Sequence, residues 1–205
     1  YFNDELKVKL LFSVCFIHPT VMFRIEMLQK NELEYNVNYP NSQDYELWSR
    51  LIDYTQMANI QKVLLKYRVN DNSITATTDK NKADLRYKLL NSIHKEFLRK
   101  LKIENTEDES RLHFNICTDD KISKQMIDLK QLREYLMKII QANQVAKYFD
   151  ETYLLIFLSR KFLTVFRHQY QIGNNQIFQA LLSKFFYIGA YSFIKNKFNK
   201  KSMDK

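Results

Sequence analysis

Glycine and proline are scarce in this sequence, with two of each among 205 residues. An all-β sandwich or barrel needs a tight turn after each short strand, and such turns depend heavily on glycine and proline. The shortage therefore argues against an all-β fold and favours helices. A chain of 205 residues is also long enough to bury a core, as one large domain or two small ones.

Apolar residues recur every three to four positions through much of the chain after residue 76. In the first such segment, the apolar positions four residues apart are Leu85, Leu89, Ile93, Phe97 and Leu101. This period is that of an amphipathic helix, and it also predicts helices at 129–143, 150–168 and 176–198. A polar and acidic segment, 102–110, interrupts the pattern and is the best internal boundary.

The first part of the chain combines short predicted helices, at 4–12 and 24–31, with two predicted strands. His18 precedes a proline, which favours extended backbone, so we expect His18 to lead into a strand at 20–23. Apolar and polar residues alternate through 59–70, a pattern typical of a strand with one buried face.

The segment between these strands, N-S-Q-D-Y-E-L-W-S-R-L-I, is Asn41–Ile52. Its apolar residues form one helical stripe, which predicts a helix at 42–56. Either Asn41 or Ser42 can cap the helix through a side-chain oxygen. Asp44 then lies in the first turn, where the helix dipole favours a negative charge. Trp48, one turn later, can stack on a sugar, although packing into the core is the favoured interpretation.

Three segments in this order resemble the C-terminal part of family 2 glycosyltransferases with the GT-A fold. They are I-H-P-T-V-M-F-R at 17–24, Q-D-Y-E-L-W-S-R-L at 43–51 and L-K-Y-R-V-N-D-N-S-I-T at 65–75. The resemblance covers roughly residues 5–76. It implies a mainly α chain with a small β component, an α+β fold. Residues 1–76 would be a truncated acceptor-side GT-A segment, and 77–205 a C-terminal helical bundle.

The resemblance also implies roles for individual residues. Asp44 would be the catalytic base that takes the proton from an acceptor hydroxyl, and His18 and Trp48 would lie near the acceptor. Arg68 would bind the diphosphate leaving group through paired hydrogen bonds. Asn70 stands where the family commonly has histidine, which puts a metal or leaving-group role there in doubt, and Ser73 matches a hydroxyl position.

The same resemblance implies a reaction that the 205 residues do not complete alone. The family places a nucleotide-sugar donor and a divalent metal, Mg²⁺ or Mn²⁺, on an N-terminal half with an Asp-x-Asp pair that is not found here. We therefore expect a fragment that binds no metal and transfers no sugar in isolation. The full-length enzyme would act on a glycan or lipid-linked acceptor in cell-surface polysaccharide synthesis.

The formal net charge of +9 supports a second interpretation, a basic helical module that binds a protein, a membrane surface or nucleic acid. Nucleic acid is not expected, because the lysines are dispersed and most aromatic residues fall on helix core stripes. A basic end on the last helix suits peripheral membrane contact, although a core role is favoured for its apolar residues. Cys15 and Cys117 are too few for a disulfide framework, so we expect a cytoplasmic protein, at most peripheral to the inner membrane face. A catalytic fold without its first half would expose apolar surface, which allows a homo-oligomer.

Overall fold

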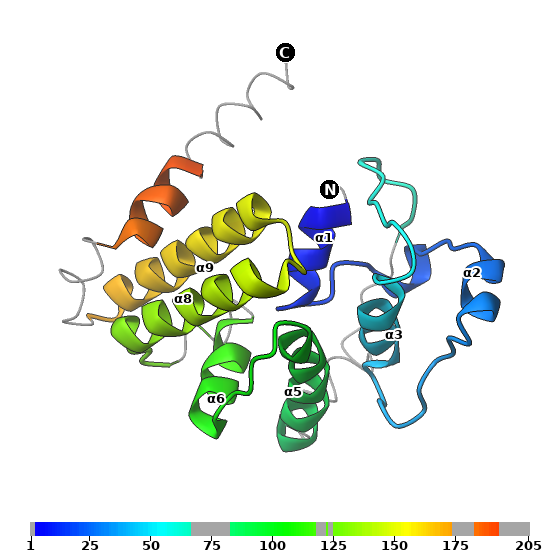
Figure 1. Cartoon of the computed structure of the whole chain (residues 1–205), viewed down its shortest axis with the longest axis horizontal. Helices are drawn as coiled ribbons and strands as arrows, with labels where there is room; N and C mark the ends of the chain where they lie inside the picture. Colours follow the sequence, from blue (N-terminus) through cyan, green and yellow to red (C-terminus); the bar gives the residue numbers. More distant parts are fainter. Residues whose placement is uncertain (1–2, 67–82, 118–121, 123–124, 174–182, 193–205) are drawn as a thin grey trace, which may run out of the picture. The chain divides into compact units, whose positions relative to one another are not determined.

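The computed structural model describes residues 3–66, 83–117, 122, 125–173 and 183–192 (Figure 1). The chain divides into two compact units, Tyr1–Arg99 and Lys100–Lys205. Throughout the described ranges the regular structure is helical and no strand is present. The predicted α+β fold with a GT-A segment is therefore wrong. The predicted division at residues 76 and 77 lies outside the described residues.

The first unit contains short helices joined by long irregular connections. They are α1 (Asn3–Leu10), the 3-10 helix η1 (His18–Thr20), α2 (Ile25–Lys30), α3 (Gln43–Leu51) and most of α5 (Ala83–Lys100). The helices predicted from apolar spacing are confirmed here, with ends shifted by a few residues. The unit buries a core to which α1 and α3 contribute most, including Leu6, Leu10, Leu47 and Trp48.

The two predicted strands are absent for different reasons. At 18–20 the chain forms η1, because Pro19 occupies its first turn, where a fixed backbone φ and a missing N–H are tolerated. Residues 21–24 follow without regular structure, and no segment within the described ranges pairs with them as a strand. Residues 59–66 alternate as a strand would, but no described segment offers them a backbone ladder, and the rest of that prediction, 67–70, lies outside the described residues.

A buried hydrogen bond fixes α3 to α1. The Tyr45 hydroxyl donates to the Leu10 carbonyl oxygen over 2.6 Å, and both residues are buried. Leu10 is the last residue of α1, so its carbonyl has no partner within the helix. Tyr45 therefore satisfies an orphan acceptor and at the same time sets the position of the neighbouring residue, Asp44.

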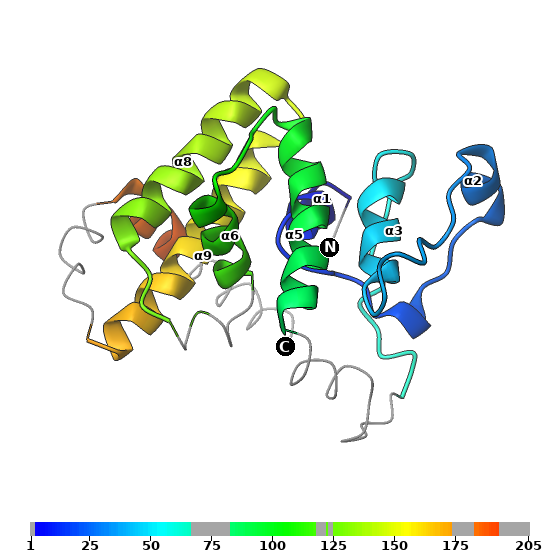
Figure 2. The ribbon, with the colours of Figure 1, turned by 90° about the horizontal axis from the view of Figure 1, so that it is seen from below.

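The second unit is built on α8 (Leu129–Ala146) and α9 (Glu151–Gln171), which lie side by side as a helical hairpin (Figures 1 and 2). In the turn, Lys147 adopts a left-handed φ of 53°. The buried Asn143 side chain accepts from the Phe149 N–H (2.8 Å) and donates to the Phe149 carbonyl (2.9 Å). Asp150 then caps α9 by accepting from the Tyr153 N–H.

A third helix of this unit, α6 (Glu107–Ile116), begins inside the acidic segment 102–110. Thr106 and Glu109 form a capping box, in which each side chain accepts from the other residue's backbone N–H. A further helical segment spans 184–192. None of the described helices combines the length and the apolar character needed to cross a membrane.

Candidate functional site

Three of the six residues predicted for the site lie in described parts of the first unit. His18 begins η1, Asp44 lies in the first turn of α3, and Trp48 follows one turn later. The other three, Arg68, Asn70 and Ser73, lie outside the described residues, so their predicted roles remain predictions.

The start of α3 differs in detail from the predicted cap. Asn41 adopts a left-handed φ of 63°, which turns the chain into the helix. Ser42 occupies the N-cap position, yet its side chain makes no capping hydrogen bond. Asp44 instead accepts from the Tyr45 N–H through Oδ1 over 2.8 Å. Asp44 is half-buried, and this is its one hydrogen bond among the described residues, so Asp44 Oδ2 keeps its acceptor capacity.

Tyr35, for which no role was predicted from the sequence, contacts His18. Its hydroxyl lies 2.9 Å from His18 Nε2, and the two rings meet edge to face with centroids 5.6 Å apart. Burial, and then the negative charge of Asp44, raise the pKa of Tyr35. The hydroxyl therefore stays protonated and can hydrogen-bond the imidazole. The phenol and the imidazole are thus in direct contact, and the negative charge of Asp44 acts on the phenol.

Residues of α3 also hold the loop that carries Tyr35. Arg50 donates through Nη2 to the Glu34 carbonyl (2.7 Å), one residue before Tyr35. The same guanidinium pairs with both carboxylate oxygens of Glu46, at 2.7 and 2.8 Å. Because a bidentate pair fixes the plane of a guanidinium, Glu46 orients Arg50 toward the loop.

Trp48 packs beneath this group. Its side chain is 1% exposed, and its ring centroid lies 6.2 Å from that of Phe16, 6.4 Å from that of His18 and 6.2 Å from that of Phe23. An indole this deeply buried presents no free face for stacking on a sugar. The Trp48 ring packs against one side of the His18 imidazole. His18 itself is exposed.

The first unit also contains the Cys15 thiol, which lies 4.0 Å from the Leu6 carbonyl oxygen. Burial is the largest influence on this group and raises the pKa of Cys15 to about 12, against the opposing effect of Lys9. Since the thiolate is the nucleophilic form, the raised pKa disfavours Cys15 as a nucleophile at neutral pH. The chemistry available here is that of Asp44, which can accept a proton, with His18 and Tyr35 to bind hydroxyl groups.

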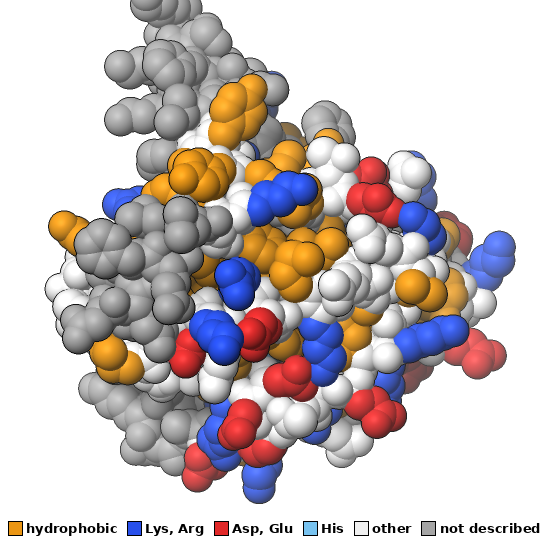
Figure 3. Space-filling model, turned by 60° about the vertical axis from the view of Figure 1, so that its left-hand side comes forward, with side chains coloured by type: hydrophobic (Ala, Val, Ile, Leu, Met, Phe, Trp, Pro, Cys, Tyr) orange, Lys and Arg blue, Asp and Glu red, His pale blue; other side chains and the backbone are white. Residues whose placement is uncertain are grey.

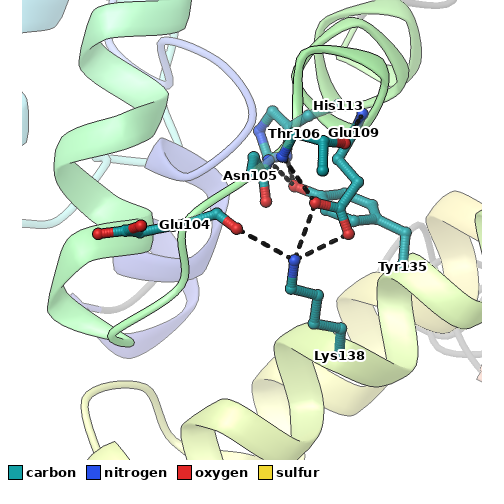
Figure 4. A network of polar contacts seen from close by, with 7 residues as sticks. All are labelled: Glu104, Asn105, Thr106, Glu109, His113, Tyr135 and Lys138. Atoms are coloured by element: carbon teal, nitrogen blue, oxygen red, sulfur yellow. Dashed lines mark hydrogen bonds and ion pairs between the residues drawn. The ribbon is translucent and has the colours of Figure 1, made fainter.

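A second polar cluster, in the second unit, is closed off by its own hydrogen bonds (Figure 4). Lys138 Nζ lies 2.8 Å from both carboxylate oxygens of Glu109. The buried Tyr135 hydroxyl lies 2.7 Å from His113 Nδ1 and accepts from Asn105 Nδ2 over 3.0 Å. Burial chiefly raises the pKa of Tyr135. Most polar atoms of these side chains pair with one another, which indicates a structural role, although the buried Asn105 Oδ1 has no hydrogen-bond partner among the described residues.

Comparisons with known proteins identify two curated relatives. The chain is similar to the O-antigen biosynthesis glycosyltransferase WbnJ of Escherichia coli, with 34% identity over 106 residues, 50% of this chain and 39% of that protein. It is also similar to an uncharacterized glycosyltransferase of Haemophilus influenzae, with 29% identity over 75 residues, 36% of this chain and 23% of that protein. No protein-family profile matches the chain, and no solved structure matches it.

The matched part of this chain thus spans well under half the length of either relative. Both relatives carry the name glycosyltransferase, which agrees with the resemblance found in the sequence. The comparisons therefore support a relationship to glycosyltransferases.

Proposed function

We propose that this chain is the acceptor-binding part of an inverting glycosyltransferase, with Asp44 as the base. The observations that carry the proposal are the half-buried Asp44 carboxylate in the first turn of α3 and the Tyr35–His18 contact, whose phenol is influenced by the charge of Asp44. A half-buried carboxylate with an unused oxygen can take the proton of an acceptor hydroxyl as that hydroxyl attacks the anomeric carbon. The exposed His18 can bind a neighbouring hydroxyl and orient the acceptor.

The donor side of the reaction belongs, in this proposal, to a further part of the enzyme. That part supplies the nucleotide sugar and its divalent metal, while Arg68 of this chain contacts the diphosphate, with Asn70 and Ser73 as further substrate-binding residues. Many apolar side chains of the first unit are exposed, and in this proposal they pack against the donor-binding part of the enzyme. The most exposed are Met22 (96%), Val63 (94%), Val37 (87%), Ile60 (72%) and Leu64 (72%).

A helical scaffold without catalysis is the competing function. Such a scaffold would allow the carboxylate of Asp44 to be packed away and fully paired. Asp44 is instead half-buried, with one hydrogen bond among the described residues. The geometry favours the enzyme.

A chimaera tests the proposal, in which this chain replaces the matching segment of the Escherichia coli relative. We expect sugar transfer by the chimaera and none by the 205 residues alone. Asp44→Asn should lower kcat by about 10²–10⁴-fold, the range for loss of a general base. The exposed Asp53, just beyond α3, offers a matched control, and Asp53→Asn should leave kcat unchanged. Full activity of the Asp44→Asn chimaera would refute the assignment.

A further inference from the structure

The helical segment 184–192 has two faces of different character. Its inner face packs on α9: Phe185 is 3% exposed, with its ring centroid 5.8 Å from that of Phe162. Gly189 permits the close approach, because a Cβ at this position would lie 2.5 Å from the Ser159 carbonyl oxygen. Ser192 accepts a hydrogen bond from Arg160 Nε. The core role predicted for this segment is confirmed for this face.

The outer face carries a lysine and two tyrosines. Lys184 is exposed, Tyr187 is 61% exposed and Tyr191 is 68% exposed. Their spacing of three and four residues places all three on one side of the helix. Phe186 and Ile188 are only half-buried and extend the apolar surface beside them. In the upper part of Figure 3 hydrophobic side chains gather, with lysine or arginine side chains among them.

The sequence that contains this face and continues after it is strongly basic. From residue 184 to residue 203 it contains five lysines, Lys184, Lys195, Lys197, Lys200 and Lys201, and no acidic residue. A partner that covers the outer face therefore meets two aromatic rings together with the positive charge of Lys184. That combination fits a surface that is anionic outside and apolar just beneath.

We propose that the outer face of 184–192, defined by Lys184, Tyr187 and Tyr191, binds the surface of an anionic lipid bilayer. Tyrosine suits this boundary, because its ring is apolar and its hydroxyl can remain in water. Basic residues add electrostatic attraction to acidic headgroups. The helix would lie in the plane of the interface, with its inner face still packed on α9.

Two other occupants fit less well. A second copy of the chain would bring two basic segments together, in a protein whose net charge is already +9. Single-stranded RNA could stack on the tyrosines, but the half-buried Phe186 and Ile188 beside them offer apolar area that bases and phosphates do not use. The lipid surface accounts for charge and apolar area together.

Co-sedimentation of the whole chain with vesicles tests the proposal. One set of vesicles is pure phosphatidylcholine, and in the other part of that lipid is replaced by phosphatidylglycerol. We expect binding to the second set alone, weakened by added salt. Lys184→Gln should weaken binding about fivefold, since each basic residue near an anionic surface contributes on the order of one kilocalorie per mole.

The tyrosines give the sharper test. Changing Tyr187 and Tyr191 together to serine should weaken binding more than about tenfold, as expected if each ring buries on the order of 30 Å² of apolar surface. Because both rings are exposed, the double variant should retain the wild-type circular dichroism and thermal midpoint. Tyr54→Ser is the matched control, since Tyr54 is 53% exposed in the first unit, and it should bind as the wild type does.

Three results would overturn the proposal. Unchanged vesicle binding by the double tyrosine variant would show that the outer face is not the contact. A dimer that the double variant abolishes, without vesicle binding, would assign the face to a second copy. Binding to polyuridylic acid but not to vesicles would assign it to nucleic acid. The assay needs no sugar transfer, so it stands or falls independently of the proposed function.

Discussion

Tyr45→Phe removes one oxygen atom and should loosen the helix that presents Asp44. The lost hydroxyl donates to the Leu10 carbonyl over 2.6 Å, in a place where Tyr45 is 4% and Leu10 0% exposed. Water does not reach the carbonyl, so the change leaves a buried acceptor without its donor. Loss of one partner from a buried pair costs about 1–3 kcal/mol.

The single tryptophan makes this loss measurable in the first unit. Trp48 is the one tryptophan of the sequence and is buried in that unit, so its fluorescence reports the unfolding of the first unit alone. For a urea slope of about 2 kcal/mol per molar, the midpoint should fall by about 0.5–1.5 M. The slope itself should stay unchanged, because the exposed area hardly differs.

A second tyrosine supplies the control for this experiment. Tyr54 is 53% exposed, so Tyr54→Phe should leave the urea midpoint where it is. If Tyr45→Phe proves as stable as the wild type, then the hydroxyl does not hold α3 to α1 and our account of how Asp44 is positioned fails. If both variants lose stability equally, the effect belongs to tyrosine in general and not to this bond.

Three further predictions concern the second unit. The pKa of Glu109 is lowered, because hydrogen bonds from Lys138 and the Thr106 backbone outweigh burial, which alone would raise it. The ionised Glu109 therefore stabilises the fold above pH about 4.5, and this contribution is lost as the pH falls through the lowered pKa of Glu109 in the folded protein. Lys138→Met should make the free energy of unfolding depend less on pH in the acid range. Burial raises the pKa of Tyr135 in the folded protein, so as the pH rises the Tyr135 hydroxyl ionises first in the unfolded protein. The free energy of unfolding should therefore decline above pH about 10. Tyr135→Phe should reduce that decline, as measured by urea titrations at several pH values. Gly189→Ala should destabilise the packing of 184–192 by about 1–3 kcal/mol, seen as faster amide hydrogen exchange there, because the new Cβ meets a backbone oxygen.

The helices could be predicted because their signal is local. In α8, Leu129, Leu132, Leu136 and Ile139 recur at helical spacing, and each is buried in the structure. The start of α6 was missed for an equally local reason. Thr106 and Glu109 carry a capping-box signature, but they lie in an acidic segment that was interpreted only as a break.

The strands could not be predicted by the same means. Alternation through 59–66 describes what a strand would bury, but a strand also needs a neighbour for its backbone groups. Within the described residues that neighbour is absent, and Val63 and Leu64 remain exposed. The alternation of apolar and polar residues through 59–66 therefore identified apolar side chains that a partner could bury, but it did not identify that partner.

In the candidate site, too, the sequence pattern does not predict which residues come into contact. His18 and Asp44 were selected from two separate motifs, 26 residues apart. Tyr35 contacts His18 and its pKa responds to the charge of Asp44, yet it lies in a loop whose sequence has no recognisable pattern. Arg50 places that loop by a bond to a backbone carbonyl, which any residue type could provide. A hydrogen bond to a backbone carbonyl does not depend on the type of the accepting residue, so it cannot be recognised from the sequence. The position of Tyr35 beside His18 therefore appears only in the three-dimensional structure.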